Sequence, residues 1–187
     1  PIGGVGLFCP PHNSPMHWLK ILTPLCAASL LSVVPSLGFT QTTGDDVLLQ
    51  MQQAFRKGDK AALARLLPAA QGHALEPWAA YWELKARLND ATYPEIQSFL
   101  QRYPGTYQED RLRNDWLLLT GKRRDWASFV PELPRFRMGD DPQVRCYAVA
   151  ADVANGKAPT RDAVQQVRRD WFAQRDLDDG CLLAAGL

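Results

Sequence analysis

General acid–base chemistry on this chain would depend on its five glutamates. A carboxylic acid cleaves a glycosidic bond when a cleft raises its pKa. The five residues are Glu76, Glu83, Glu95, Glu109 and Glu132. Each lies on a predicted helix or at a helix end, in hydrophilic surroundings. We therefore interpret all five as capping or surface residues, and we predict no catalytic residue.

This sequence contains few residues suited to histidine-based catalysis, phosphate binding or metal binding. His73 is the one histidine after residue 38, so a His-based triad or a multi-His metal site cannot form there. Three acidic pairs lie near predicted helix starts, where carboxylates complement the helix dipole, and none has EF-hand spacing. They are Asp45 with Asp46, Asp140 with Asp141, and Asp178 with Asp179. No glycine-rich phosphate loop follows a strand, and we predict neither a cofactor nor a metal.

Two cysteines, Cys146 and Cys181, remain once the N-terminal segment is set aside. In an exported protein, two cysteines in one compact domain indicate a disulfide. Closing a loop of this length stabilises a fold by roughly 3–4 kcal/mol on the chain-entropy model. The alternative is a pair of buried free thiols. Zinc is not expected, because no histidine or further cysteine lies at ligand spacing near either residue.

Several tryptophans are candidates for stacking on sugar rings. Trp78 and Trp82 share a helix face with Tyr81, at i, i+4 and i+3, and Trp116 and Trp126 follow along the chain. We name these four tryptophans as candidate glycan contacts. The alternative, which we favour, is that the large rings fill the interface between paired helices.

The stretch RYPGTYQEDRLRNDWLLLTGKRRDW, from Arg102 to Trp126, mixes basic, acidic and aromatic residues. A nucleic-acid surface, a sugar platform and the outside of a helical hairpin are the three interpretations. The chain holds 21 basic and 20 acidic residues, so it has no general attraction for phosphate backbones, and we predict no nucleic-acid partner. We interpret the charges as the solvated face and caps of a hairpin, and the rings as its core.

The N-terminal segment predicts export. Residues 1–15 are rich in glycine and proline and are interpreted as a non-native or upstream extension, with translation starting at Met16. Residues 16–38 have the order of a cleaved signal peptide: a short basic region, an apolar run, then small residues before the cleavage site. The apolar run is short for a membrane span and contains Pro24, so no stable membrane anchor is expected. Cys26 lacks a small residue before it, which makes lipidation a poor match.

Residues 39–187 carry helical periodicity throughout and no sustained period-two alternation. The predicted helix ends Gly58, Asn89, Gly121 and Gly156 are separated by 31, 32 and 35 residues. This is the period of stacked helical hairpins. We predict an all-α fold, a right-handed superhelical α-solenoid of U-shaped type, with a globular helix bundle as the alternative. The apolar end at Leu187 lacks the polar cap of such an array, so further hairpins are expected beyond it.

Local signals predict where individual helices begin. Asp59 and Asp125 are expected to cap the helices that follow them. Thr106 and Glu109 have the spacing of a capping box, in which each side chain accepts a hydrogen bond from the other residue's N–H.

The residues themselves suggest a family. FLQRYPGTYQEDRLRNDWLLLTGKRRDWASFV, from Phe99 to Val130, resembles the N-terminal superhelical region of soluble lytic murein transglycosylases. In that family an aromatic-Pro turn leads to an R-L-R-x-x-W-L helix, then to glycine with a basic residue, then to D-W-x-x-F. LEPWAAYWELKARL is similar to the preceding hairpin, and VRCYAVAADVANGK with the later Cys181 is similar to a cysteine segment and its downstream partner.

The resemblance implies a periplasmic enzyme that cleaves the MurNAc–GlcNAc bonds of peptidoglycan and forms a 1,6-anhydro product. In the family, a C-terminal lysozyme-like domain carries the catalytic glutamate in a Glu-Ser motif. None of the five glutamates here precedes a serine, so no catalytic residue carries over. We expect an inactive N-terminal fragment that supports the enzyme or guides its substrate. It would meet peptidoglycan strands through the full-length enzyme, whose C-terminal domains are missing from this chain. The alternatives are a free-standing periplasmic solenoid that binds a protein, and a carbohydrate-binding module that uses the tryptophans.

Overall fold

The computed structural model describes residues 44–187. The chain divides into two units between Phe39 and Thr40, and the described residues all belong to the second unit. The predictions for residues 1–15 and for the signal peptide at 16–38 therefore lie outside the described residues.

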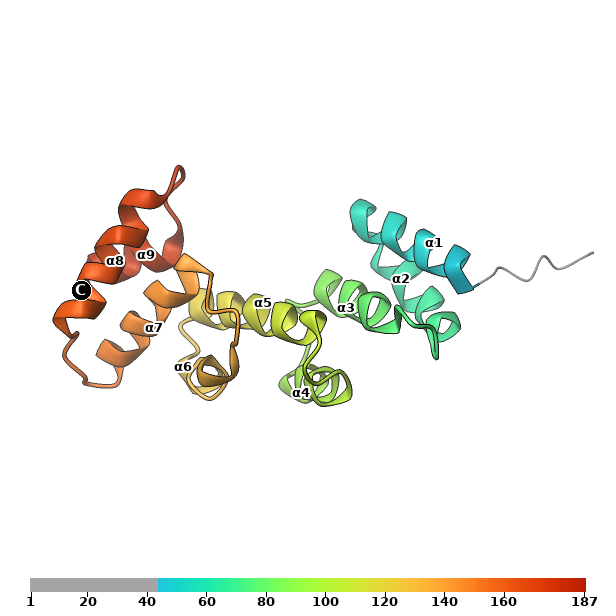
Figure 1. Cartoon of the computed structure of the whole chain (residues 1–187), viewed down its shortest axis with the longest axis horizontal. Helices are drawn as coiled ribbons and strands as arrows, with labels where there is room; N and C mark the ends of the chain where they lie inside the picture. Colours follow the sequence, from blue (N-terminus) through green and yellow to red (C-terminus); the bar gives the residue numbers. More distant parts are fainter. Residues whose placement is uncertain (1–43) are drawn as a thin grey trace, which may run out of the picture. The chain divides into compact units, whose positions relative to one another are not determined.

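Residues 44–187 are all-helical and contain no strand, which confirms the all-α prediction for this part of the chain (Figure 1). The α-helices are α1 (Gly44–Lys57), α2 (Lys60–Leu66), α3 (Glu76–Ala86), α4 (Tyr93–Arg102), α5 (Tyr107–Arg123), α6 (Trp126–Phe129), α7 (Pro142–Ala154), α8 (Arg161–Ala173) and α9 (Asp179–Ala185). Two short 3₁₀ helices, η1 (Leu67–Ala70) and η2 (Leu133–Arg135), follow α2 and α6. No helix within 44–187 has both the length and the apolarity required to cross a bilayer.

Side-chain caps start most of these helices, as the sequence predicted. The carboxylates of Asp59 and Asp125 accept hydrogen bonds from backbone N–H groups in the first turns of α2 and α6. The Thr106 hydroxyl likewise accepts from the N–H of Glu109. The Glu109 carboxylate, however, accepts from the N–H of Gly105, so the predicted reciprocal capping box at α5 is only half formed. A complete capping box occurs instead at α4, between Thr92 and Glu95.

The prediction that Gly121 ends its helix is wrong. Helix α5 continues to Arg123, and Arg124 closes it in the left-handed conformation at φ 59°. Gly121 lies where α5 meets α7, and a Cβ on it would overlap the Tyr147 ring. The glycine is therefore required by close packing between two helices and not by a helix stop.

The principal contacts between helices follow the order of the chain. The odd-numbered helices form one series, in which α1 contacts α3, α3 contacts α5, α5 contacts α7, and α7 contacts α9. The even-numbered helices pack on their odd-numbered neighbours: α2 on α1 and α3, α4 and α6 on α5, and α8 on α7 and α9. Each helix thus buries its apolar face against helices that are close to it in sequence.

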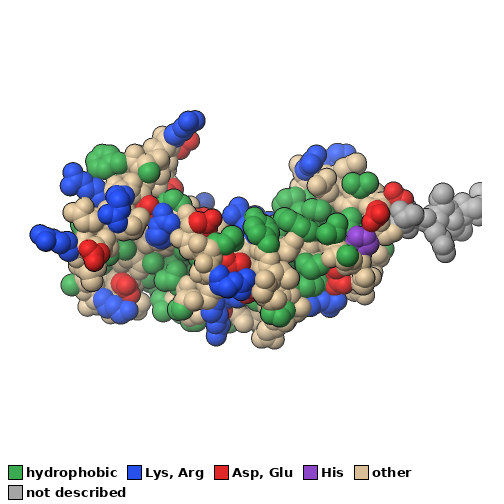
Figure 2. Space-filling model, in the orientation of Figure 1, with side chains coloured by type: hydrophobic (Ala, Val, Ile, Leu, Met, Phe, Trp, Pro, Cys, Tyr) green, Lys and Arg blue, Asp and Glu red, His purple; other side chains and the backbone are tan. Residues whose placement is uncertain are grey.

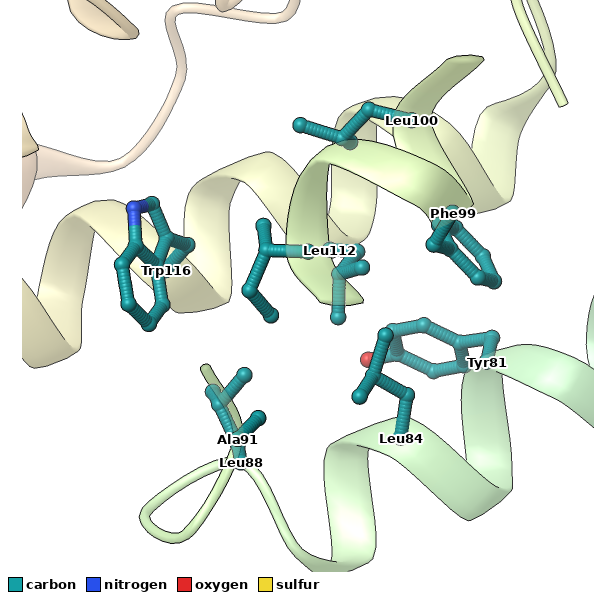
Figure 3. Packing of buried hydrophobic residues seen from close by; sticks show 9 residues of the cluster. Tyr81, Leu84, Leu88, Ala91, Phe99, Leu100, Leu112 and Trp116 are labelled. Carbon is teal, nitrogen blue, oxygen red and sulfur yellow. The ribbon is translucent and has the colours of Figure 1, made fainter. Parts of the chain in front are cut away.

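The apolar core is correspondingly divided into clusters along the chain. One cluster joins α3, α4 and α5, and Figure 3 shows its side chains on these three helices and on the turn between α3 and α4. Separate clusters lie among α1, α2 and α3, among α5, α6 and α7, and around the two cysteines. Helix α5 contributes to the first and the third of these clusters, which makes it the central element of the described chain.

Candidate functional site

Helix α5 buries an unusual number of charged and polar side chains. Its buried polar residues are Gln108, Glu109, Asp110, Arg113, Asn114, Asp115 and Thr120. The interpretation of the stretch from Arg102 to Trp126 as the solvated face of a hairpin is therefore wrong for most of the charges on α5. Buried charges are retained in proteins when they are paired or hydrogen-bonded, and the pairs formed here are specific.

Glu132 is at the centre of the first group of pairs. Its side chain is fully buried and forms an ion pair with Arg113, which is 6% exposed. The same carboxylate accepts hydrogen bonds from Gln97 at 2.7 Å, Tyr93 at 3.2 Å and Arg135 at 3.1 Å. Because these partners lie on α4, α5 and η2, one carboxylate connects three helices. We call Glu109, Arg113 and Glu132, with Arg135 and Arg137 at their edge, the buried ion cluster.

Glu109 belongs to the same cluster. It forms ion pairs with Arg113 and with Arg137, the second at 2.7 Å. Burial favours the neutral form, but the two guanidinium groups and the N–H of Gly105 outweigh it and lower the pKa of Glu109 below its ordinary value. The sequence-based interpretation of Glu109 and Glu132 as capping or surface residues is thus wrong for Glu132, and incomplete for Glu109, which both caps and is buried.

A neighbouring carboxylate holds the loop that follows η2. Asp110 is buried and accepts hydrogen bonds from the backbone N–H groups of Arg137 and Met138, at 2.9 and 2.8 Å. This loop has no helix or strand of its own at these positions, and its backbone donors need partners. The polar side of α5 supplies them.

None of the carboxylates whose pKa is displaced resembles a general acid. The pKa of Glu76 is lowered chiefly by hydrogen bonds from the Gly72 N–H and the Tyr103 hydroxyl. The pKa of Glu95 is lowered to about 2, mainly by the N–H and hydroxyl of Thr92. A glycosidase acid requires the opposite displacement. Glu76, Glu95 and Glu109 are therefore held ionised and act as structural anions.

A third buried carboxylate on α5, Asp115, contacts residues of α3. It accepts a hydrogen bond from the Tyr81 hydroxyl at 2.7 Å and forms an ion pair with Lys85 at 2.5 Å. Burial and the nearby Asp115 charge raise the pKa of Tyr81. Burial opposes the charge of Arg111, but the Asp115 carboxylate and the Tyr81 hydroxyl raise its pKa above the ordinary value. Lys85 thus pairs with this buried anion, and Arg111 lies one helical turn before it on α5.

The structure separates the four candidate tryptophans. Trp78 and Trp82 are half-buried on α3, with ring centroids 5.8 Å apart. Trp116 is 4% exposed and lies in the core cluster of Figure 3, so it offers no open ring face. Trp126, on α6, packs against the rings of Phe129 and Tyr147.

Two further rings extend the α3 pair. Phe55 of α1 stacks on Trp82 with centroids 6.3 Å apart, and Tyr107 of α5 lies 5.7 Å from Trp78. We call Phe55, Trp82, Trp78 and Tyr107 the ring row. Its outer member, Tyr107, is 54% exposed. Neither Phe55 nor Tyr107 was a candidate from sequence, because ring contacts across three helices leave no local spacing signal.

The predicted disulfide between Cys146 and Cys181 is present. Both residues are fully buried, and their Cα atoms lie 4.8 Å apart. The bridge joins α7 to α9, and Asp179 adds two interactions beside it, with the Tyr147 hydroxyl at 2.6 Å and with Arg124 at 2.9 Å. Gly180 lies against the backbone of Gln143, so a Cβ there would meet the Gln143 carbonyl oxygen at 2.7 Å.

His73 has a structural setting. Its Nε2 lies 2.9 Å from the Asp45 carboxylate, and its Nδ1 accepts a hydrogen bond from the N–H of Leu75. Within residues 44–187, no group of three or more His, Cys, Asp or Glu side chains could hold a metal ion.

Comparison with known proteins adds no further assignment: no protein-family model matches this sequence, and no curated protein matches it. The two notable features of the described chain are thus the buried ion cluster and the ring row. The first can hold helices in place but presents no unpaired acid or base. The second presents partly exposed aromatic rings, with Lys85 one turn after Trp82 on α3 and Arg111 one turn after Tyr107 on α5.

Proposed function

We propose that this chain is the α-superhelical scaffold part of a periplasmic lytic transglycosylase that acts on peptidoglycan, and that it is not catalytic by itself. In this proposal the helices form a right-handed solenoid of stacked hairpins. The chain supports the enzyme or guides its substrate, and a lysozyme-like domain elsewhere in the protein cleaves the glycosidic bond.

The observation that carries the proposal is the way in which the residues of the family resemblance are used. Leu112, Arg113 and Trp116 belong to the R-L-R-x-x-W-L pattern, and all three are buried on α5. Phe129, from the D-W-x-x-F pattern, is fully buried on α6. A pattern whose members pack helices together is what a scaffold requires, whereas a catalytic pattern would present groups to a cleft.

The sequence in which the helices contact one another along the chain supports the solenoid. Each odd-numbered helix contacts the next odd-numbered helix, and the even-numbered helices pack on their neighbours in sequence. In a stacked array each hairpin contacts only adjacent hairpins. Solution scattering tests this part. A solenoid of residues 39–187 has a radius of gyration above the about 15 Å of a compact domain of this length, and a value near about 15 Å would favour the bundle.

The enzymatic part of the proposal needs two measurements. The purified chain, incubated with murein sacculi, is expected to release no 1,6-anhydro-muropeptides detectable by mass spectrometry. The nucleotide sequence after the Leu187 codon is expected to continue into a lysozyme-like domain with a Glu-Ser motif. Release of anhydro products would overturn the non-catalytic role. A stop codon directly after Leu187 would instead support the free-standing interaction module.

A further inference from the structure

We propose that the ring row, with Arg111 and Lys85 beside it, is a contact surface for a glycan strand that carries carboxylates. The occupant to which we commit is the murein glycan strand, and this choice rests on the proposed function. Its members come from α1, α3 and α5.

The rings provide an extended aromatic surface. Phe55, Trp82, Trp78 and Tyr107 follow one another with centroids 6.3, 5.8 and 5.7 Å apart, and all four keep part of their surface exposed. Figure 2 shows hydrophobic side chains gathered where α3 adjoins α1. The row extends across three helices, and no further helix of the described chain covers its exposed ring surface. Aromatic faces of this kind stack on the C–H faces of sugar rings, while the Tyr107 hydroxyl supplies a polar edge.

The charges beside the row define the chemistry of the occupant. Lys85 pairs with the buried Asp115 at 2.5 Å, and Arg111, one turn away on α5, forms no ion pair of its own within residues 44–187, so these three groups carry one net positive charge. The Lys85 side chain is 35% exposed, and Arg111 is exposed. A carboxylate on the occupant would pair with this charge, because guanidinium groups bind carboxylates with well-oriented hydrogen bonds. Neutral glycans lack this group.

Nucleic acid is a weaker fit to the same surface. Single strands are held by stacking and by a groove of cations that tracks the phosphates. Here two cations flank four rings, one of their charges is already neutralised, and the chain as a whole is close to neutral. A single acidic group for each stretch of stacked rings matches this surface better than one phosphate for each base.

The experiment titrates the full chain with three probes and measures binding by calorimetry and tryptophan fluorescence. The probes are uncrosslinked murein glycan oligosaccharides, chitooligosaccharides of equal length, and an oligo-dT strand. We expect the murein oligosaccharides to bind and the neutral chitooligosaccharides to bind about tenfold more weakly. Arg111→Gln is expected to remove most of that difference, and Tyr107→Ala to weaken binding of both sugars, about tenfold in Kd.

Both variants change exposed side chains, so loss of fold does not explain the result. Trp126→Phe, which changes a ring outside the row, is the control and is expected to bind as the unchanged chain does. Three outcomes would overturn the proposal that the ring row contacts murein. They are absence of binding, unchanged binding by Arg111→Gln and Tyr107→Ala, and tighter binding of oligo-dT. If one of these outcomes is found together with a lysozyme-like reading frame after Leu187, the surface is rejected and the proposed scaffold function stands. Binding of murein without that frame removes the enzyme assignment and keeps the surface.

Discussion

Two short segments of this molecule are held on longer helices in different ways. Residues 132–138, around η2, are held on α5 by buried charges and by the Asp110 carboxylate. Helix α9 is held on α7 by a covalent bridge, and by a glycine that allows close approach of the backbones. The first attachment depends on ionisation and on each partner being present. The second depends on the oxidation state of two cysteines and on the absence of a single Cβ.

The comparison shows how short segments are stabilised without a large apolar core of their own. Helix α9 has seven residues and η2 has three, lengths at which a helix is not stable alone. Each therefore needs an attachment stronger than apolar packing. Three changes test the two attachments and one tests the α5–α7 contact between them, and they are ordered here by expected effect.

Removing the disulfide gives the largest expected effect. The bridge spans 35 residues, and on the chain-entropy model its loss lowers the free energy of unfolding by roughly 4 kcal/mol. The measurement is urea unfolding of the double variant Cys146→Ala with Cys181→Ala, followed by circular dichroism. Reductant should destabilise the unchanged chain and leave the double variant unaffected. A loss below about 1 kcal/mol would mean that α9 is held mainly by its noncovalent contacts.

Removing the Glu132 charge comes next. Glu132→Gln leaves Arg113 buried with one fewer anion, so we expect a loss of roughly 3 kcal/mol. Arg135→Gln is the matched control, because it removes a partner of the same carboxylate whose side chain is 61% exposed. It should cost under about 1 kcal/mol. Equal losses of unfolding free energy in the two variants would show that the buried ion pair stabilises the fold no more than the exposed one.

Adding one methyl group at the α5–α7 contact is expected to have a smaller effect. In Gly121→Ala the new Cβ overlaps the Tyr147 ring, and overpacking of this kind costs about 1–3 kcal/mol. Gly186→Ala is the control, since a Cβ there meets its nearest atom, the Leu183 carbonyl oxygen, at 3.5 Å. Thermal unfolding should give a lower melting temperature for Gly121→Ala than for Gly186→Ala. Identical melting temperatures would contradict the close packing of Gly121 against Tyr147.

Acid should weaken the ion cluster and spare the disulfide. The pKa of Glu109 is lower in the folded chain than its ordinary value of 4.5. The unfolded chain therefore binds the proton first, and stability is lost as the pH falls below about 4.5 and through the folded pKa. Glu109→Gln should make the dependence of unfolding free energy on pH shallower between neutral and acid conditions. The double cysteine variant should keep the original slope, and a slope unchanged in Glu109→Gln would assign the acid sensitivity to other carboxylates.

Much of the local structure was predictable because its causes are local. The helical period, the Asp59 and Asp125 caps and the pairing of Cys146 with Cys181 all follow from short-range patterns or from the small number of cysteines. The errors have a common origin. Gly121 and the charges of α5 were interpreted by the preferences of an isolated helix, whereas their positions are decided by Tyr147 on α7 and by Glu132 after α6.

The sequence by itself therefore determined that this chain is helical, where most of its helices begin, and which cysteines pair. Only the tertiary structure decided that α5 is polar and buried at once. A charge on a helix is stable in water or beside an opposite charge, and residue type alone does not distinguish the two environments. Glu132 pairs with Arg113 from 19 residues away, and Tyr81 bonds Asp115 from 34 residues away, so this environment exists only after the chain has folded.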